Sequence, residues 1–447
     1  MASPVADRDG PAVSPDGGER PASSAAVAVV GAGYVGLTTA ACLARMGHRV
    51  VCTDIDEPRI TGLQGGEVPI REPGLDELVR AGLDSGGLSF ACGSAEAASR
   101  ADFVFLCVPT PASSGGGTDL SFLEAAATEM GRSLRPGTVV VNKSTAPAGT
   151  TQFLARVLGR VDVPVASNPE FLRQGSAVRD FLNPDRVVVG AADAAVAERV
   201  AGLYASIDAP VLITDPASAE TVKYAANAFL ATKLSFSNAV AALCEAVGAD
   251  VDDVLAGMGH DRRIGRDYLK PGPGWGGSCL PKDTRALIDA ASAAGYDFGL
   301  LRSVVEANEA QFARIIGKVA SRVALPGARV ALLGLAFKAG TDDLRDSPSL
   351  EIARRLVEAG AAVHAYDPAI RSNAATAEAG IVVTADAYAA CDGASALVVA
   401  TEWDDFRQLD FDQVARVMAE LHVIDARNLL DRDDLERRGF TYSGVGG

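Results

Sequence analysis

One cysteine lies in a segment whose chemistry is unusual for a packing residue. Cys279 follows the glycine-rich run Pro271–Gly277 and precedes Pro281, which fits the first position of a helix. This placement sets the sulfur near the positive end of that helix, with Lys282 close by, and both effects should lower the thiol pKa. Buried cysteine is also a common small core residue, but the glycines would let a bulky ligand approach the chain. We therefore predict that Cys279 is a nucleophile.

A glycine loop near the N-terminus is the second chemical signal. The motif GAGYVG follows an apolar strand at 25–30 and opens an apolar helix, and the next strand leads into Asp54. Glycines let the backbone approach a pyrophosphate, the helix N-terminus offers amides, and the acid would accept from a ribose hydroxyl. An ordinary tight turn is the alternative. The dinucleotide contacts predicted here are Gly31, Gly33, Tyr34, Val35, Gly36, Asp54 and Arg59.

The acid after the second strand also bears on which dinucleotide is bound. A carboxylate at Asp54 would repel a 2′-phosphate, so NAD is expected rather than NADP, although Arg59 lies near enough in sequence to offset this preference. A dinucleotide accepts hydride, and a thiol can capture an aldehyde as a covalent sulfur intermediate. Together they predict oxidation of an alcohol or aldehyde to the acid level. Neither the cysteine nor the histidine spacing indicates a metal site.

Composition narrows the classes of partner. Lys and Arg number 41 against 57 Asp and Glu, a formal net charge of −16, so the overall field repels nucleic acid and anionic membranes. No apolar run approaches the roughly eighteen residues that span a bilayer. Residues 1–24 are rich in Pro, Gly, Ser and Asp without an apolar core, which favours a disordered tail over a signal peptide. We expect a cytoplasmic protein without nucleic-acid or membrane partners.

Strand and helix signals after the tail divide the chain into three regions. Residues 25–213 alternate apolar strands with helices and predict a doubly wound NAD-binding domain of the Rossmann type. Residues 214–322 are predicted to be helical, beginning with an unbroken helix of roughly 45 Å from Asp215 to Gly248. Residues 323–447 return to the βαβ pattern without the glycine fingerprint. The predicted fold class is α/β, with two Rossmann-like doubly wound domains joined by a long central helix and a helical middle region.

Polar residues in apolar surroundings are further site candidates. Lys223 and Asn227 lie four residues apart on the long helix, so they share a face. A buried cation is costly unless it faces a polar site, but a lysine snorkelling at the helix edge is an equally good interpretation. Glu170 and Thr145 each follow a predicted strand, where open α/β sheets bind ligands. Either could instead be an ordinary turn residue.

Seven motifs in a single order carry a family resemblance. They are GAGYVG, KSTAPAG, SNPEFL, KYAANAF, DRRIG, GGSCLPKD and LGLAFKAGTDDLRDSPS. From about residue 25 to the C-terminus the chain resembles the UDP-glucose/GDP-mannose dehydrogenase family, most closely its UDP-glucose branch. The resemblance implies an NAD domain, a central dimer-forming region and a C-terminal domain for the sugar nucleotide. It also implies oxidation of UDP-glucose at C6 to the uronate, with NAD as acceptor, by a homodimer or higher homo-oligomer.

The same resemblance implies roles for matching positions. Cys279 would capture the C6 aldehyde, and Lys223 and Asn227 would stabilise oxyanions. Asp283 would serve acid–base steps with Thr145 and a water, and Glu170 would assist thioester hydrolysis. Further NAD contacts would be Thr110, Thr145, Lys282 and Arg345. Substrate contacts would be Glu170, Phe171, Leu172, Lys223, Asn227, Arg263, Tyr268, Lys270, Gly276, Phe337, Lys338 and Arg427, with Arg263 reaching in from a neighbouring subunit.

One position departs from the family pattern. Members often carry a second glutamate four residues after the first, and here that position is Gln174. The sugar pocket is not legible from sequence, so a GDP-mannose or UDP-N-acetylhexosamine 6-dehydrogenase is an alternative. A non-catalytic NAD-binding sensor or scaffold is an alternative of another class. An intact Cys279 followed by Lys282 and Asp283 argues against a scaffold, which would not need the thiol.

Overall fold

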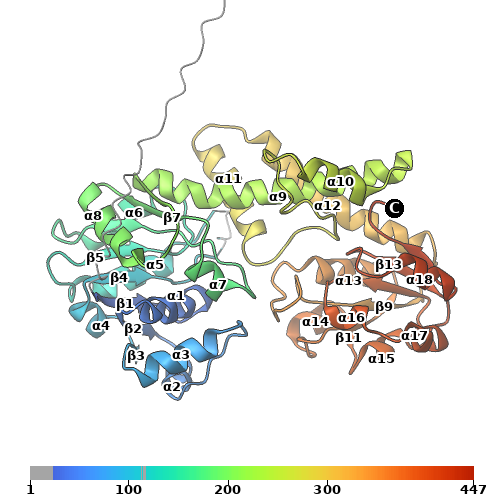
Figure 1. The fold of residues 1–447 in the computed structure, drawn as a ribbon, viewed down its shortest axis with the longest axis horizontal. Helices are drawn as coiled ribbons and strands as arrows, with labels where there is room; N and C mark the ends of the chain where they lie inside the picture. Colours follow the sequence, from blue (N-terminus) through green and yellow to red (C-terminus); the bar gives the residue numbers. More distant parts are fainter. Residues whose placement is uncertain (1–23, 112, 114–116) are drawn as a thin grey trace, which may run out of the picture.

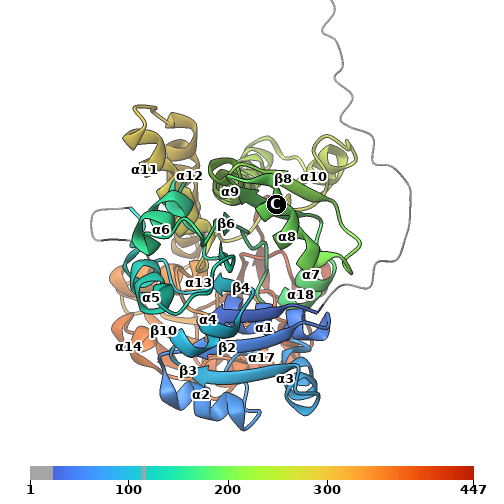
Figure 2. The same ribbon diagram turned by 90° about the vertical axis from the view of Figure 1, so that its left-hand side faces the viewer.

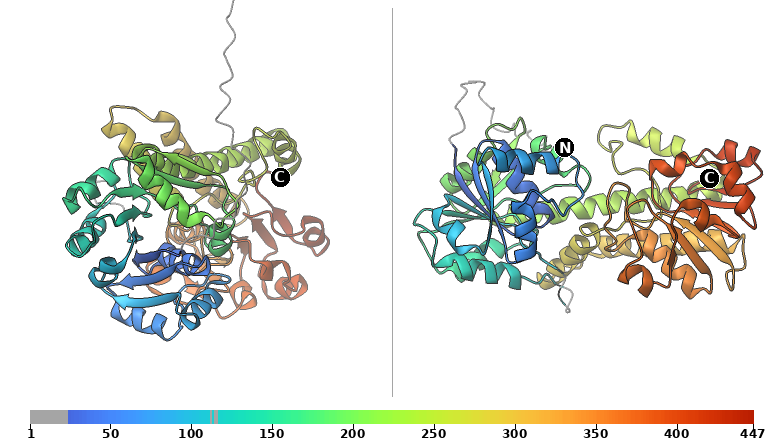
Figure 3. Two further views of the ribbon diagram at one scale, coloured as in Figure 1. Left: turned by 60° about the vertical axis from the view of Figure 1, so that its left-hand side comes forward. Right: turned by 90° about the horizontal axis from the view of Figure 1, so that it is seen from below.

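Two α/β domains lie near the two ends of a long helix in the computed structural model, which describes residues 24–111, 113 and 117–447 (Figure 1). The predicted disordered tail, residues 1–24, falls outside this part except for its last residue. The long helix, α9, runs from Pro216 to Val247. Seen from below, it passes from one domain to the other (Figure 3). No helix among the described residues is both long and apolar enough to cross a membrane.

The N-terminal domain is built on an eight-stranded sheet with the order β3-β2-β1-β4-β5-β6-β7-β8 (Figure 2). Neighbouring strands are parallel except β6 and β7, which pair antiparallel. The strands are β1 Ala26–Val30, β2 Arg49–Asp54, β3 Leu88–Cys92, β4 Phe103–Leu106, β5 Val139–Asn142, β6 Val165–Ser167, β7 Val187–Ala191 and β8 Val211–Thr214. The helices are α1 Tyr34–Arg45, α2 Glu57–Gln64, α3 Leu75–Asp84, α4 Ala95–Arg100, α5 Ser121–Gly131, α6 Thr150–Leu158, α7 Ala177–Leu182 and α8 Ala194–Ala201.

Both faces of this sheet are covered, which explains why its strands are continuous apolar runs. Val27 and Val29 pack into one hydrophobic cluster, whereas Ala28 and Val30 pack into another. Successive side chains of a strand point to opposite faces, so each face of β1 is buried by its own layer of helices. The glycine loop therefore begins at the end of a strand that is fixed on both sides.

Local signals at its two ends define α9. The carboxylate of Asp215 accepts from the backbone N–H of Ser218 at 2.9 Å, and Pro216 occupies the first turn. Gly248 adopts φ 72° and ends the helix. The 32 residues between them span about 48 Å. The predicted long helix is therefore confirmed.

Three more helices complete the middle region, and a second sheet forms the C-terminal domain. The middle helices are α10 Val251–Gly259, α11 Leu280–Ala293 and α12 Gly299–Ala320. The second sheet is parallel throughout, with the order β11-β10-β9-β12-β13-β14. Its strands are β9 Arg329–Leu333, β10 Ala362–Tyr366, β11 Val382–Val383, β12 Ala396–Val399, β13 His422–Asp425 and β14 Thr441–Ser443. Its helices are α13 Pro348–Glu358, α14 Ala374–Glu378, α15 Ala387–Cys391, α16 Asp404–Arg407, α17 Phe411–Val417 and α18 Arg432–Arg437.

Both strand orders contain the doubly wound pattern 3-2-1-4-5-6, so the predicted fold class is confirmed. The predicted domain boundaries, 25–213, 214–322 and 323–447, stay predictions. In the structure β8 ends at Thr214 and α12 ends at Ala320.

Candidate active site

A single cavity of about 1280 Å³ extends from the glycine loop to the C-terminal domain. All three regions of the chain contribute to its wall, with Gly31 at one end, Cys279 between and Arg427 at the other end. Most of the residues selected from the sequence line this cavity. The exceptions are Gly36, Arg263 and Asp283.

The glycines of the loop have different functions. A Cβ at Gly31, where φ is 101°, would lie 2.6 Å from the carbonyl oxygen of Cys107, and one at Gly36 would lie 1.8 Å from the carbonyl oxygen of Gly31. These two glycines allow the tight turn, which explains why Gly36 is not on the cavity wall. Gly33 instead faces open space, and α1 begins there without a side-chain cap. A pyrophosphate fits such uncapped amides beside an open glycine.

The acid at the end of β2 is tied to the loop. The Asp54 carboxylate accepts from the backbone N–H of Ala32 at 2.7 Å and from that of Asp56 at 3.0 Å. Arg59 Nη1 lies 3.4 Å from the same carboxylate. Asp54 and Arg59 both line the cavity. Asp54 therefore holds the glycine loop in place and still faces the region where a ribose would bind.

A buried ion pair lies where α9 meets the segment after β6. Lys223 Nζ is 2.9 Å from Glu170 Oε1, and their side chains are only 4% and 6% exposed. The other oxygen of Glu170 accepts from the backbone N–H of Leu172 at 2.6 Å. Burial alone would lower the pKa of Lys223 and raise that of Glu170. The attraction between the two charges acts together with the Leu172 N–H and Lys143 at Glu170, and with Cys279 and Asp283 at Lys223. The combined effect outweighs burial and shifts both pKa values the other way, so both groups are ionised at neutral pH.

Burial of the Lys223 ammonium decides between the two interpretations left open by the sequence. A snorkelling lysine would carry its charge to bulk water, whereas this side chain is buried and lines the cavity. Phe171 contributes its ring 5.4 Å from Lys223 Nζ, and the guanidinium of Arg186 lies 3.6 Å above the same ring. The cation and its aromatic neighbour thus form one wall of the cavity beside Asn227.

Asp283 lies behind the cavity wall rather than on it. Its side chain is 1% exposed and accepts from Asn227 Nδ2 at 2.6 Å, while Lys282 Nζ is 2.6 Å from its other oxygen. Asn227 and Lys282 line the cavity and lie between Asp283 and the open space. The acid–base function suggested for Asp283 therefore has to pass through these two side chains or through a water.

The thiol itself opens into the cavity at the start of α11. Cys279 is an exposed free cysteine and the N-cap residue of that helix, yet the cavity walls surround its sulfur. Burial raises the pKa of Cys279, Glu170 and Asp283 add to the increase, and Lys223 opposes it. The prediction of a lowered thiol pKa is wrong, first because the thiol is buried and second because two carboxylates lie near the sulfur, while the charge of Lys282 is paired with Asp283. At rest the thiol is protonated.

The segment before Cys279 is fixed by glycine contacts with the C-terminal domain. A Cβ at Gly276 would lie 1.9 Å from the carbonyl oxygen of Asp346, and one at Gly277 would lie 2.7 Å from the ring of Phe337. The N–H of Gly277 donates to Asp346 at 3.1 Å. Trp275 is anchored on the other side, where its indole N–H donates to Ser235 of α9 at 2.8 Å. The long helix and the C-terminal domain together position the thiol.

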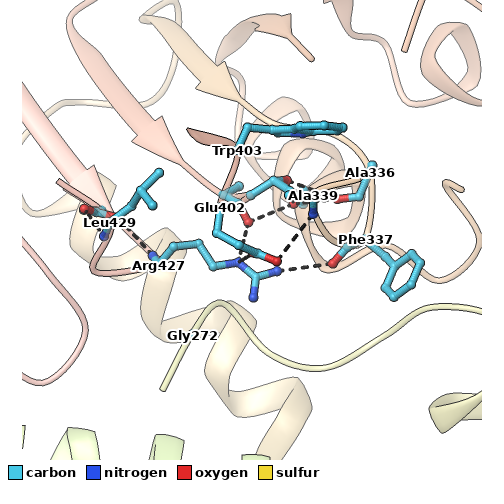
Figure 4. Close-up of polar contacts among 12 residues, drawn as sticks. Gly272, Ala336, Phe337, Ala339, Glu402, Trp403, Arg427 and Leu429 are labelled. Atoms are coloured by element: carbon cyan, nitrogen blue, oxygen red, sulfur yellow. Dashed lines mark hydrogen bonds and ion pairs between the residues drawn. The ribbon is translucent and has the colours of Figure 1, made fainter. Parts of the chain in front are cut away.

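Cations from the C-terminal domain line the far end of the cavity. The guanidinium of Arg427 donates from Nε to the carbonyl oxygen of Ala400 at 2.9 Å and from Nη2 to that of Phe337 at 3.2 Å (Figure 4). Glu402 Oε2 forms an ion pair with Arg427 Nε at 3.1 Å. Lys338 also lines this end, and its ammonium donates to the backbone carbonyl of Gln174. Positive charge here suits a diphosphate.

The remaining contacts selected from the sequence divide into two groups. Those on the cavity wall are Val35, Tyr34, Thr110, Thr145, Leu172, Tyr268, Lys270 and Arg345. Arg263 is the exception, because its side chain is 89% exposed and pairs with Asp261 at 2.6 Å away from the cavity. Its contribution from a neighbouring subunit stays a prediction.

Many residues on the wall were not selected from the sequence, and Lys143, Ile55 and Glu402 are three of them. Lys143 is buried, donates to Asn168 Oδ1 at 3.0 Å, and has a pKa lowered to about 8, chiefly by burial. Ile55 is 81% exposed next to Asp54, and Glu402 pairs with Arg427. All three follow the carboxyl end of a parallel strand, β5, β2 or β12, where ligands bind in open α/β sheets. This position after a strand is the sequence signal that could have identified the three residues as site candidates.

Three family models match three consecutive segments of the chain, one in each region described above. Models of the UDP-glucose/GDP-mannose dehydrogenase family match residues 25–208 as the NAD binding domain, 217–310 as the central domain and 331–432 as the UDP binding domain. The chain belongs to this family. It is an NAD-dependent oxidoreductase, as the glycine loop and thiol predicted.

Individual relatives cover nearly the whole chain. A UDP-glucose 6-dehydrogenase of Pseudomonas aeruginosa is 45% identical over 438 residues, which cover 94% of this chain and 96% of that protein. The structure of a UDP-glucose dehydrogenase from Pyrobaculum islandicum has a TM-score of 0.87 at 38% identity and covers 97% of this chain and 100% of that one. A UDP-D-ManNAc dehydrogenase structure from Pyrococcus horikoshii has a TM-score of 0.84 at 30% identity, covering 94% and 99%.

The raised thiol pKa predicts how Cys279 reacts with an alkylating agent. Because the thiolate is the nucleophile, iodoacetamide should modify Cys279 slowly near neutral pH, with a rate that rises about tenfold per pH unit through pH 9. Peptide mass spectrometry after timed quenching gives the rate. Cys92, an exposed thiol on β3, provides an internal reference in each sample. A Cys279 rate that is already constant from pH 7 upward would contradict the resting protonated thiol.

Proposed function

We propose that the protein oxidises the C6 alcohol of UDP-glucose to the carboxylate of UDP-glucuronate, with NAD as acceptor and Cys279 as covalent nucleophile. The observation that carries the proposal is the position of Cys279 beside the Lys223–Glu170 pair, in one cavity that joins the glycine loop to the C-terminal cations. A cytoplasmic location is part of the same proposal.

The choice of sugar nucleotide rests on sequence similarity. The relative from Pseudomonas aeruginosa that is named a UDP-glucose 6-dehydrogenase is 45% identical, whereas the Pyrococcus horikoshii structure named a UDP-D-ManNAc dehydrogenase is 30% identical. The two solved structures have nearly equal TM-scores, 0.87 and 0.84, so the fold does not separate the substrates. UDP-N-acetylhexosamines and GDP-mannose are the competing substrates.

Sulfur chemistry divides the oxidation into two stages. The C6 alcohol becomes an aldehyde, Cys279 adds to that aldehyde as a thiohemiacetal, a second oxidation gives a thioester, and water releases the acid. NAD, when bound, accepts one hydride in each of the two oxidations. A covalent link to Cys279 holds the aldehyde-level sugar in the cavity between them. The raised pKa of Cys279 means that a proton must leave the sulfur as it adds.

The buried pair and the amide beside it stabilise charge that develops at C6. The Lys223 ammonium and the Asn227 side chain lie on the wall beside the thiol and can donate to an oxyanion there. Removing one donor of this kind typically costs about 100- to 1000-fold in rate. Glu170, kept ionised by Lys223, can accept a proton from the water that hydrolyses the thioester. Asp283 acts through Asn227 or through a water near Thr145.

A non-catalytic sensor or scaffold explains the site less well. Burying the charges of Lys223 and Glu170 costs several kcal/mol per ion before they pair. A protein that only bound NAD would gain nothing from placing this pair next to an accessible thiol. A site that stabilises charge during a reaction, in contrast, needs such a buried pair despite this desolvation cost.

Product stoichiometry across a panel of sugar nucleotides tests the proposed function. We expect two NADH per UDP-glucose consumed, measured by absorbance at about 340 nm and by chromatography of the uronate, and little NADH from GDP-mannose or UDP-N-acetylhexosamines. NADH from a UDP-N-acetylhexosamine alone would move the assignment to that branch of the family. No NADH from any member of the panel would refute an enzymatic function.

The Cys279→Ser variant tests the covalent stage. A serine hydroxyl can still attack the aldehyde and be oxidised to an ester, but its poorer leaving group should slow hydrolysis by orders of magnitude. Intact-protein mass spectrometry should therefore find the variant carrying a sugar-nucleotide adduct, with less than one turnover of NADH. Cys279→Ala provides the matched control and should carry no adduct. Free uronate from Cys279→Ala at the wild-type rate would rule out the covalent mechanism.

We also propose that the protein is at least a homodimer with α9 at the interface. Phe229, Phe236 and Leu243 are spaced seven residues apart on this helix and are 64%, 54% and 60% exposed. Seven residues are two helical turns, so the three side chains form a single exposed apolar stripe. Apolar stripes of this kind are typical of contact with another protein surface.

A charge in the middle of the stripe should separate the subunits. Phe236→Glu would bury a carboxylate in an apolar contact, so we expect the sedimentation coefficient at micromolar concentration to fall from the dimer to the monomer value. Val382→Glu, at a 52% exposed position in the C-terminal domain, is the control and should stay dimeric. A wild-type monomer at that concentration would exclude the proposed assembly.

A further inference from the structure

Gln174 is the point where the N-terminal domain contacts the C-terminal domain beside the cavity. Its side-chain amide Nε2 donates to Asp343 Oδ2 at 3.0 Å, and the hydroxyl of Thr341 donates to its Oε1 at 3.5 Å. The ammonium of Lys338 donates to its backbone carbonyl. The side-chain nitrogen, the side-chain oxygen and the backbone carbonyl of Gln174 therefore all form hydrogen bonds with one segment of the other domain, residues 338–343.

Asp343 links Gln174 to Arg345, because its carboxylate accepts hydrogen bonds from both side chains. The Asp343 side chain is 9% exposed, and its two oxygens accept from Arg345 Nε at 2.9 and 3.1 Å. Arg345 Nη2 donates to the same carboxylate at 2.5 Å. Gln174 therefore holds one side of a carboxylate whose other side orients a guanidinium, and Gln174 and Arg345 both line the cavity. Loss of the amide would free Asp343 to turn, and Arg345 would turn with it.

The loop that carries Gln174 is also fixed from the cofactor side. Glu72, only 6% exposed, accepts from the backbone N–H of Gly175 at 2.7 Å and from that of Ala177 at 2.8 Å. The hydroxyl of Tyr34, at the start of α1, donates to Glu72 and lies 3.3 Å from the carbonyl oxygen of Arg173. A continuous set of hydrogen bonds therefore runs from the glycine loop through residues 173–177 to Arg345.

An amide is the group that suits this position chemically. It donates to the carboxylate of Asp343 and accepts from the hydroxyl of Thr341 without carrying charge. A glutamate in its place would bring two carboxylates to hydrogen-bonding distance, and one of them would have to hold a proton. The charged groups around the site are Asp343, Arg345 and Lys338 from the C-terminal domain and Glu72, Arg173 and Asp180 from the N-terminal domain.

We propose that Gln174 is a positioning residue that couples the cofactor loop to the C-terminal domain and fixes Arg345 on the cavity wall, independently of pH across the working range. The inference rests on the proposed function only where NADH formation is the readout. The inference concerns how the glycine loop and the C-terminal domain are held relative to each other. It does not depend on the reaction at Cys279.

The isosteric variant Gln174→Glu tests this directly. At low pH either the introduced carboxyl or that of Asp343 is protonated and the hydrogen bond between them can form, but deprotonation at higher pH sets like charges against each other. We expect kcat/KM for UDP-glucose close to wild type near pH 6 and about tenfold or more below wild type near pH 9. Gln174→Ala removes the amide without adding charge, so its loss of kcat/KM should be constant over the same range.

Exchanging the amide of residue 174 with the carboxylate of residue 343 should restore kcat/KM, which would not be expected if Gln174 only stabilised the fold. The double variant Gln174→Glu with Asp343→Asn keeps one carboxylate and one amide in contact, but on opposite domains. We expect it to regain kcat/KM above both single variants and to lose the pH dependence of Gln174→Glu, giving a favourable coupling in the double-mutant cycle. Asp343→Asn alone controls for the altered partner of Arg345.

A binding measurement separates this inference from the proposed function. Gln174 also holds Lys338, a predicted sugar-nucleotide contact, through its backbone carbonyl. Calorimetric titration of UDP, which needs no turnover, should therefore show the same pH-dependent weakening for Gln174→Glu, while thermal unfolding confirms that each variant is folded. If the wild type formed no NADH, the proposed function would fail and the UDP titration would still judge Gln174. Gln174→Ala with wild-type kcat/KM and UDP affinity, or Gln174→Glu with a wild-type pH profile and no coupling to Asp343, would overturn the proposal.

Discussion

The ion pair between Lys223 and Glu170 is the interaction on which the geometry of the site depends. Each charge has left water, and removal of either partner from such a pair typically costs about 3–5 kcal/mol, because the other is left buried and alone. The two residues belong to α9 and to the segment after β6, so the pair also fastens the long helix to the NAD domain. One turn further along, α9 carries Asn227, which holds Asp283. Two turns beyond that lies Ser235, which holds Trp275 before the thiol.

Elements with strong local signals could be predicted from the sequence. The long helix begins with the capping residue Asp215 and with Pro216, and it ends at Gly248. Both limits could therefore be predicted without knowledge of the rest of the fold. The glycine loop is likewise recognisable from its own residues. The strand β8 has no comparable local signal, because Val211–Thr214 is a short run with exposed side chains at the edge of the sheet. The antiparallel pairing of β6 with β7 depends on tertiary packing and leaves no local signal.

The errors at the site came from distances that sequence does not reveal. The thiol pKa was predicted from the helix end and from Lys282, whereas burial by the rest of the fold and the carboxylate of Glu170, remote in sequence, raise it. Asp283 was expected to serve acid–base steps with Thr145 and a water, and its burial beside Asn227 and Lys282 could not be inferred from the sequence. Gln174 was recognised only as a missing charge. Its partner Asp343 lies 169 positions away, so its contact could not be inferred.

The protonated resting state of Cys279 has a consequence for the durability of the enzyme. Peroxides oxidise thiolates, and the susceptibility of a cysteine to sulfenic and then irreversible sulfinic acid formation follows its thiolate character and exposure. Cys279 is exposed to the cavity, so access alone would leave it vulnerable. Burial and the two neighbouring carboxylates keep it in the unreactive form between turnovers. The same electrostatics that delay attack on the aldehyde therefore protect the sulfur from oxidative loss while the cavity is empty.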